Sequence, residues 1–265
     1  MGSVIPLKNS ANSAYLDLRN LVANKLDKVE DLINLKLESK VNLIQKMTKH
    51  HLNSGGKRLR ALLTLGSAKL AGYDLGDRDI NLASCVELIH SATLLHDDVI
   101  DESNLRRGNK TANSIWGNQS SILTGDYLLS RCFEIMVDDG DLEILKLLSS
   151  TSSKIAQGEV LQLQHKGDAD LLEETYTKII NLKTAALFSA ATKTGACLGK
   201  LNIREKEALA SYGKNLGLAF QIADDALDYF AKEILFGKEV GKDFYEGKTT
   251  LPLIIIFQRA NDEER

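Results

Sequence analysis

The sequence predicts an all-α fold, and the scarcity of proline is the first reason. Pro6 and Pro252 are the only prolines among 265 residues, so the chain between them lacks the residue that most strongly breaks helices. That stretch is rich in Leu, Ala and Lys, which have high helix propensity. No segment alternates apolar and polar residues between turn signals, as hairpin strands do. We therefore expect helices nearly throughout the chain.

The composition is typical of one globular domain. With 265 residues and 43% hydrophobic content, the chain can form one large core. The net charge of −3 gives no indication of a nucleic-acid partner. The apolar run Leu251–Phe257 is too short to span a bilayer. Cys85, Cys132 and Cys197 are far apart among apolar neighbours, as expected for buried, reduced thiols of a cytoplasmic protein.

The repeat of apolar residues places the helices in order. Residues 11–51 predict two amphipathic helices with a break between Asp31 and Glu38, used for packing or for a dimer contact. Further helices are expected at 61–71, 83–100, 119–137, around 155–162, at 173–199 and from 204 into a long apolar run. Within 119–137 the expected core residues are Leu123, Tyr127, Leu128, Leu129 and Phe133.

A first acidic motif closes the predicted helix 83–100. Asp97 and Asp101 lie one turn apart on a helix, with Asp98 beside them and His90 two turns earlier on nearly the same line. Like charges so close repel one another, and bound cations would hold them together. Oxygen ligands without thiolates indicate Mg²⁺, which binds through one or two carboxylates and keeps positions for water and phosphate. The alternative interpretation is a solvated acidic face.

A second acidic motif has the same spacing and an apolar setting. Asp224 and Asp225 are followed three residues later by Asp228, and Gln221 lies a turn before them on the same side. The preceding residues 216–220 are apolar, which is unusual for a surface helix that carries carboxylates. Two such helices facing each other would make a cavity in which several Mg²⁺ ions bridge a diphosphate.

Basic segments lie near both acidic motifs. Two glycines precede Lys57, Arg58 and Arg60 at a predicted helix start, a pattern that suits an anion site or, alternatively, a solvated helix end. Arg106 and Arg107 follow the first motif, where they either clamp a diphosphate or balance the charge of the aspartates.

Two further lysine-bearing segments follow in the second half of the chain. Lys183 and Thr184 stand ahead of small residues and can reach into a cavity, although a surface lysine is the commoner case. The segment 236–252, with Lys238 and Lys248, is either a loop that closes over a diphosphate or a mobile, solvated loop.

Taken together, these motifs resemble those of the trans-isoprenyl diphosphate synthases. The Gly-Gly-Lys-Arg-x-Arg and Gly-Lys-Thr-Thr-Leu-Pro stretches join the two Asp motifs, and the resemblance runs from Asn53 to Phe257. Within that family the chain is similar to the octaprenyl and decaprenyl type of long-chain synthases, which make quinone side chains. The resemblance implies one helical-bundle domain over 1–265 around a central cavity, the isoprenoid synthase fold, in a homodimer. Related synthases continue in further helices, which this sequence would lack.

The resemblance also implies roles for matching residues. Three Mg²⁺ ions would be held by Asp97, Asp101 and Asp224, supported by Asp98, Asp225 and Asp228. Isopentenyl diphosphate would be bound by the basic stretch and its neighbours, namely Lys57, Arg58, Arg60, His90 and Arg107. The allylic diphosphate would be bound by Arg106, Lys183, Thr184, Gln221, Lys238 and Lys248, with Lys183 serving catalysis. Ionisation of the allylic diphosphate would precede condensation. Small residues before the first motif, Ala92 and Thr93, would permit a long product.

Other readings use part of the same residues. A helical metal-dependent phosphohydrolase would use His51, His90 and His96 with Asp97, and it would leave the second Asp motif idle. A terpene cyclase or a head-to-head condensing enzyme would share the first motif. The matching second motif and the basic stretch from Lys57 to Arg60 argue against this reading, because a cyclase has no need of a second diphosphate site. A short-chain farnesyl or geranylgeranyl synthase, and a non-catalytic helical partner subunit, are the remaining alternatives.

Overall fold

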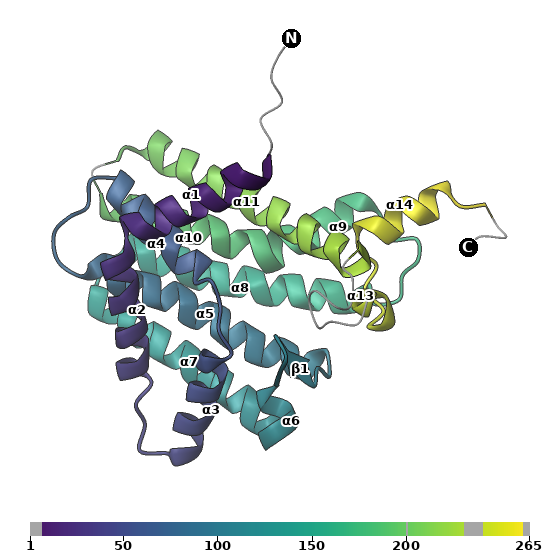
Figure 1. Ribbon diagram of the computed structural model, residues 1–265, viewed down its shortest axis with the longest axis horizontal. Helices are drawn as coiled ribbons and strands as arrows, with labels where there is room; N and C mark the ends of the chain where they lie inside the picture. The colour runs from purple at the N-terminus through teal and green to yellow at the C-terminus, as the bar shows by residue number, and fades with distance from the viewer. Residues whose placement is uncertain (1–6, 200, 231–240, 262–265) are drawn as a thin grey trace, which may run out of the picture.

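The computed structural model describes residues 7–199, 201–230 and 241–261 of the chain, and its architecture is helical (Figure 1). In chain order the helices are α1 Leu7–Leu21, α2 Ala23–Lys36, α3 Asn42–Asn53, α4 Leu59–Leu70, α5 Arg78–Ile100, α6 Ala112–Trp116, α7 Asn118–Asp139, α8 Leu142–Gln164, α9 Glu173–Ile180, the π-helical turn η1 Asn181–Ala185, α10 Ala186–Leu198, α11 Ile203–Phe230, α13 Lys242–Tyr245 and α14 Leu251–Arg259. A two-residue hairpin, β1 Leu105–Arg106 and β2 Asn109–Lys110, pairs antiparallel. The prediction of an all-α fold is confirmed.

The long helices pack side by side as a bundle. Helix α10 packs against α4, α8 and α11, and α5 packs against α4 and α7 (Figure 1). The core between them is apolar, with Leu65, Leu88 and Phe188 fully buried. Two glycines permit the closest approaches, because a Cβ on Gly195 would lie 2.3 Å from the Thr64 carbonyl oxygen and one on Gly217 2.7 Å from the Ala185 Cα. The second contact sets α11 directly against η1.

Three sequence-based expectations were wrong in detail. The segment 11–51 forms three helices rather than two, because the buried Val22 leaves helical geometry at φ −125° and starts a new helix. The predicted helix 173–199 is interrupted by η1, where the backbone makes a π turn. Leu123 and Phe133 of α7 are exposed rather than core residues, whereas Leu128 is buried. None of the helices in the described ranges is long and apolar enough to cross a membrane.

Candidate active site

The first acidic motif lies where α5 ends. Asp97 is in the last turn, the helix closes at Ile100, and Asp101 caps it, with its backbone N–H donating to the Asp97 carbonyl at 2.8 Å. Asp98 points elsewhere, since its buried Oδ1 accepts from Arg106 Nε at 2.9 Å and lies 2.8 Å from Nη2. The three aspartates therefore divide into an outer pair and one that is bound to the hairpin arginine.

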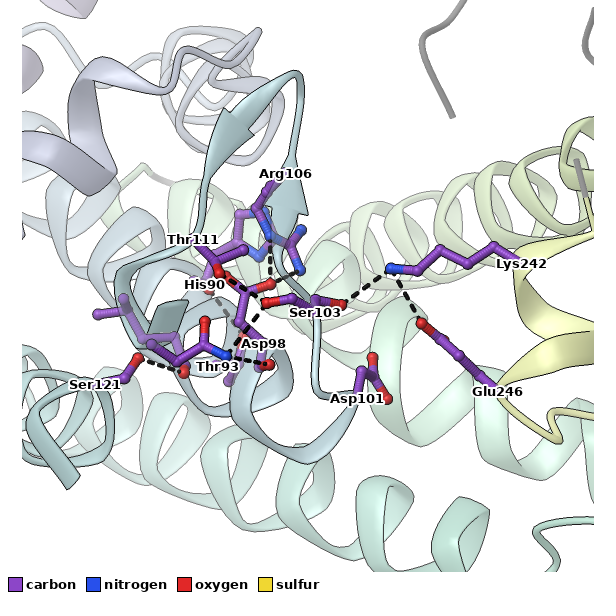
Figure 2. A network of polar contacts seen from close by, with 12 residues as sticks. His90, Thr93, Asp98, Asp101, Ser103, Arg106, Thr111, Ser121, Lys242 and Glu246 are labelled. Atoms are coloured by element: carbon purple, nitrogen blue, oxygen red, sulfur yellow. Dashed lines mark hydrogen bonds and ion pairs between the residues drawn. The ribbon is translucent and has the colours of Figure 1, made fainter. Parts of the chain in front are cut away.

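The turn after α5 is fixed by buried hydrogen bonds. Asn113 Nδ2 donates to the carbonyl oxygens of Asp98 at 3.1 Å and Ser103 at 3.2 Å. Thr111 Oγ1 donates to the same Ser103 carbonyl at 2.7 Å (Figure 2). Buried backbone carbonyls that are satisfied in this way resist displacement. Asp101 therefore stands between a helix end and a rigid turn.

The second motif lies in the last two turns of α11, and here too the middle aspartate is buried. Asp225 accepts a hydrogen bond of 2.6 Å from the Tyr176 hydroxyl and one of 2.7 Å from Gln221 Nε2. Asp228 Oδ2 accepts from the backbone N–H of Asp243 at 3.0 Å, and Asp224 is exposed. Burial raises the pKa of Asp225, an effect that its two hydrogen bonds oppose.

A pocket opens beside the second motif. Its walls come from α8, α9, η1, α11 and the segment 242–250, and its polar lining includes Lys183, Thr184, Gln221, Asp225 and Lys248. Thr184 Oγ1 donates to Gln221 Oε1 at 2.7 Å, so two of the predicted allylic-site residues already contact each other. The predicted Lys238 lies outside the described residues.

Both described lysines of the predicted allylic site form ion pairs with carboxylates. Lys183 Nζ lies 2.5 Å from Glu159 and donates to Gln162 at 2.8 Å. Lys248 Nζ lies 2.8 Å from both Asp101 and Glu246. Burial lowers the pKa of Lys248, but these two carboxylates outweigh it and the net direction is upward. Lys248 thus joins the C-terminal segment to the first motif.

The acidic groups around the site are crowded. The pKa of Asp97 is raised to about 7, mainly by burial, with nearby Glu159 and Asp101 adding to the shift and Lys183 opposing it. Burial, together with Asp228 and Asp225, raises the pKa of Asp243 to about 7 as well. Carboxylates whose charge is this poorly compensated indicate a place for additional cations.

The donor set fits Mg²⁺. The crowded groups are oxygen ligands, and within the described ranges no three His, Cys, Asp or Glu side chains converge to hold an ion by themselves. Mg²⁺ is bound in proteins through one or two carboxylates while water and phosphate oxygens complete its octahedron. The carboxylate oxygens of both motifs are ligands of the kind that this ion prefers.

A second group of cations surrounds the Gly55–Gly56 loop. The Arg107 guanidinium contacts the Gly55 carbonyl oxygen, and Arg58, in left-handed backbone geometry at φ 47°, lies 3.8 Å from the buried Glu87. Arg60 stacks with its Cζ 4.5 Å from the Phe188 ring centre, and burial lowers its pKa to about 10. Among the described residues its Nε has no hydrogen-bond partner, a feature expected of a group that binds an anion.

Two histidines lie in this cationic region. Burial and then the neighbouring Arg106 and Arg58 lower the pKa of His51 to about 3. The pKa of His90 is lowered well below its ordinary value by burial and by Arg60. Both rings are therefore neutral at pH 7 and offer an N–H or a lone pair rather than a charge.

The remaining predicted residues are placed differently. Lys57 is exposed, with Nζ 5.7 Å from the Tyr15 ring centre. Ala92 is fully buried on α5, and Thr93 Oγ1 donates to the His90 carbonyl at 2.8 Å. His96 Nε2 contacts the Ile122 carbonyl on α7 at 3.1 Å rather than His90 or His51, which disfavours the phosphohydrolase reading.

Sequence reasoning missed several residues of the site. These are Glu87, Glu159, Tyr176, Lys242, Asp243 and Glu246. His51 was named only for the alternative of a phosphohydrolase. Glu246 lies inside the predicted lysine-bearing segment 236–252, so it had a signal nearby. Tyr176 has none, because only the packing of α9 on α11 brings it to Asp225.

Comparisons with known proteins agree with this geometry. The model of the polyprenyl synthetase family matches residues 41–265. Octaprenyl diphosphate synthase of Escherichia coli is 41% identical over 93% of this chain and 76% of its own length. A short chain isoprenyl diphosphate synthase of Methanothermobacter thermautotrophicus is 40% identical over 82% of this chain and 68% of its own. The crystal structure of a Caulobacter crescentus polyprenyl synthase with calcium and isoprenyl diphosphate is 46% identical, with a TM-score of 0.91 over 94% of this chain and 76% of that one.

The chain therefore belongs to the polyprenyl synthetase family, and it is a prenyltransferase. Its bundle is the isoprenoid synthase fold of its structural neighbours. The activity that it shares with these relatives is that of a polyprenyl diphosphate synthase.

Proposed function

We propose that the protein condenses isopentenyl diphosphate with an allylic diphosphate, using three Mg²⁺ ions, to make a long-chain polyprenyl diphosphate for quinone side chains. The observation that carries the proposal is the pocket beside the second Asp motif, where Lys183, Thr184 and Gln221 line the wall next to Asp225. Lys248, from the same lining, contacts Asp101 of the first motif and so links the pocket to both motifs. A cationic and acidic lining of this kind suits a diphosphate together with divalent cations.

The allylic site would lie between the motifs. Asp97 and Asp101 at the end of α5, and Asp224 on α11, would hold the ions. When bound, Mg²⁺ would supply charge that stabilises the departing diphosphate. Lys183, Lys248 and the proposed Lys238 would bind the same oxygens, and Arg106 would add its guanidinium while it stays paired with Asp98. Each of these cations would then act where negative charge develops as the allylic C–O bond breaks.

The isopentenyl site would lie at the Gly55–Gly56 loop. Arg60, Arg107 and Lys57 would bind the second diphosphate, with Arg58 held nearby by Glu87 and Glu30. The neutral His90 can donate a hydrogen bond without adding charge. The apolar bundle core beside both sites would exclude water, which would otherwise convert the allylic cation into an alcohol.

Product length would depend on the residues before the first motif. Ala92 and Thr93 are small, so they leave room for a growing chain where an aromatic side chain would block it. The second candidate is a short product, because one relative at 40% identity is a short chain isoprenyl diphosphate synthase. We propose the long product because no aromatic residue stands at either position.

We also propose a homodimer in the cytoplasm. Ile122, Leu123, Phe133 and Val137 make an exposed apolar stripe on one face of α7, and their exposed fractions are 42%, 66%, 47% and 66%. Apolar side chains gathered on one helix face are typical of a subunit contact. Sedimentation of the purified protein would measure its mass, and a monomer at micromolar concentration would contradict this proposal.

The test of the function is an incubation with Mg²⁺, farnesyl diphosphate and labelled isopentenyl diphosphate, with products separated by chain length. We expect a ladder that reaches octaprenyl diphosphate or longer. A product that stops at geranylgeranyl diphosphate would preserve the chemistry and overturn the role of Ala92. If no label is incorporated, the proposal is wrong.

A further inference from the structure

The segment 241–248 contacts the end of the first acidic motif at two points. Lys242 Nζ donates to Ser103 Oγ at 2.9 Å, and Lys248 Nζ donates to Asp101 Oδ2 at 2.8 Å. The partners are 139 and 147 residues apart in sequence, so these contacts join distant parts of the chain. The first of them is visible in Figure 2, where Lys242 reaches Ser103 from the opposite side of the site.

Glu246 connects the two lysines. Its carboxylate lies 3.0 Å from Lys242 Nζ and 2.8 Å from Lys248 Nζ. A continuous chain of polar contacts therefore runs through five side chains, which we call the lysine latch: Ser103, Lys242, Glu246, Lys248 and Asp101. The Asp101, Glu246 and Lys248 side chains are only 15–16% exposed, so their charges are poorly screened by solvent.

The Ser103 end of the latch is rigid. Its carbonyl accepts hydrogen bonds from Thr111 Oγ1 at 2.7 Å and from Asn113 Nδ2 at 3.2 Å, and its backbone N–H donates to the Asp98 carbonyl at 2.9 Å. These bonds hold the Ser103 hydroxyl in a fixed place beside the motif (Figure 2). Because Lys242 donates to this hydroxyl, its position is fixed relative to Asp101, which lies two residues before Ser103.

The ammonium of Lys248 and a metal ion would compete for the same carboxylate. We propose that Lys248 is the resident cation of Asp101 in the metal-free protein, that a divalent ion must displace it, and that Lys242 is the positioning residue that keeps it there through Ser103. The proposal rests on the proposed function for the assignment of Asp101 to the metal. Once the ion has displaced it, the Lys248 ammonium is free to bind the diphosphate. Binding of the divalent ion and binding of the diphosphate therefore favour each other.

The test measures divalent-ion binding without any substrate. Mn²⁺ is added to the full-length, metal-free protein, and free Mn²⁺ is quantified by electron paramagnetic resonance. We expect Lys248→Met to tighten Mn²⁺ binding about fivefold, because the ion no longer competes with an ammonium. Ser103→Ala removes no charge but releases Lys242, and it should tighten binding about twofold. Lys248→Arg keeps the positive charge and should bind Mn²⁺ like the wild type.

Lys214→Met is the matched control. Lys214 is exposed on α11, and its loss removes the same charge without touching the latch, so Mn²⁺ affinity should stay within error of the wild type. Circular dichroism checks the fold of each variant, and Ser103→Ala decides the question if Lys248→Met does not fold.

Unchanged or weaker Mn²⁺ binding by folded Lys248→Met would overturn the competition. If Ser103→Ala binds Mn²⁺ with the affinity of the wild type, Lys242 is not a positioning residue. Because no prenyl substrate is present, the expected order of affinities supports the latch even if the condensation assay fails. In that case only the proposed reaction would be rejected.

Discussion

The two Asp-Asp-x-x-Asp motifs have identical spacing, yet their surroundings differ. In both, the middle aspartate is buried and bound to the protein while the outer two remain near the site. Asp98 is paired with a charged guanidinium, whereas Asp225 is held by a phenol and an amide. The comparison teaches that the middle aspartate is held by other side chains of the protein in both copies, and that only the first copy compensates its charge with a cation.

The largest effect should come from the outer aspartates. Asp97→Ala and Asp224→Ala remove proposed metal ligands, one from each motif, and each should lower kcat/KM at least about a hundredfold. Steady-state assays with labelled isopentenyl diphosphate measure the loss, and circular dichroism shows whether the fold persists. Full activity of either folded variant would contradict the metal assignment and break the parallel between the motifs.

The middle aspartates should differ in stability. Asp98→Asn leaves the partly buried Arg106 without its counter-charge and should lower the free energy of unfolding by about 2 kcal/mol. Asp225→Asn keeps an acceptor for the Tyr176 hydroxyl, so it should lose about 1 kcal/mol. Urea unfolding of both variants makes the comparison. Equal losses would show that the type of partner does not matter here.

The pH dependence should expose the crowded acid of the first motif. The pKa of Asp97 is about 7 when folded against an ordinary value of 3.8, so between these the folded protein holds a proton that the unfolded chain has released. Stability from this group is therefore lost as the pH rises from about 4 to 7. Asp97→Asn removes the buried charge, and the metal-free variant should melt a few degrees above the wild type at pH 8.

That difference in melting temperature should vanish near pH 4, where Asp97 is protonated in the wild type too. Scanning calorimetry of both proteins in chelator over this range provides the measurement. Asp243→Asn is the counterpart beside the second motif, because the pKa of Asp243 is also about 7. If Asp97→Asn is less stable than the wild type at pH 8, the raised pKa is wrong.

The smallest effect on activity should come from Tyr176→Phe. The change removes one hydrogen bond to Asp225 and keeps the ring, so the free energy of unfolding should fall by about 1 kcal/mol. Because Gln221 still donates to Asp225, kcat should change little while the KM for the allylic substrate rises modestly. A kcat loss as large as that of Asp224→Ala would mean that Asp225 acts directly in the reaction.

The sequence was sufficient for the features that depend on local pattern. Helical periodicity and the absence of proline predicted the bundle, and the Asp spacing picked out the ends of α5 and α11. It failed where a partner lies far along the chain. Asp98 looks the same as Asp97 in sequence, and only the hairpin that carries Arg106 separates their environments. Glu159 became part of the site only through its contact with Lys183 of η1.

The π turn at Asn181–Ala185 contains Lys183 and Thr184. The direction of these two side chains depends on the number of residues in the turn, and not only on their chemistry. A π turn accommodates one more residue than an α turn, and a helix without it would rotate every later position by about 100° about its axis. Helix α8 packs closely against this turn, because a Cβ on Gly158 would lie 2.7 Å from the Lys183 backbone nitrogen. The register of this helix therefore decides which side chains face the site. Deleting one residue of the π turn would change that register while every site residue is retained.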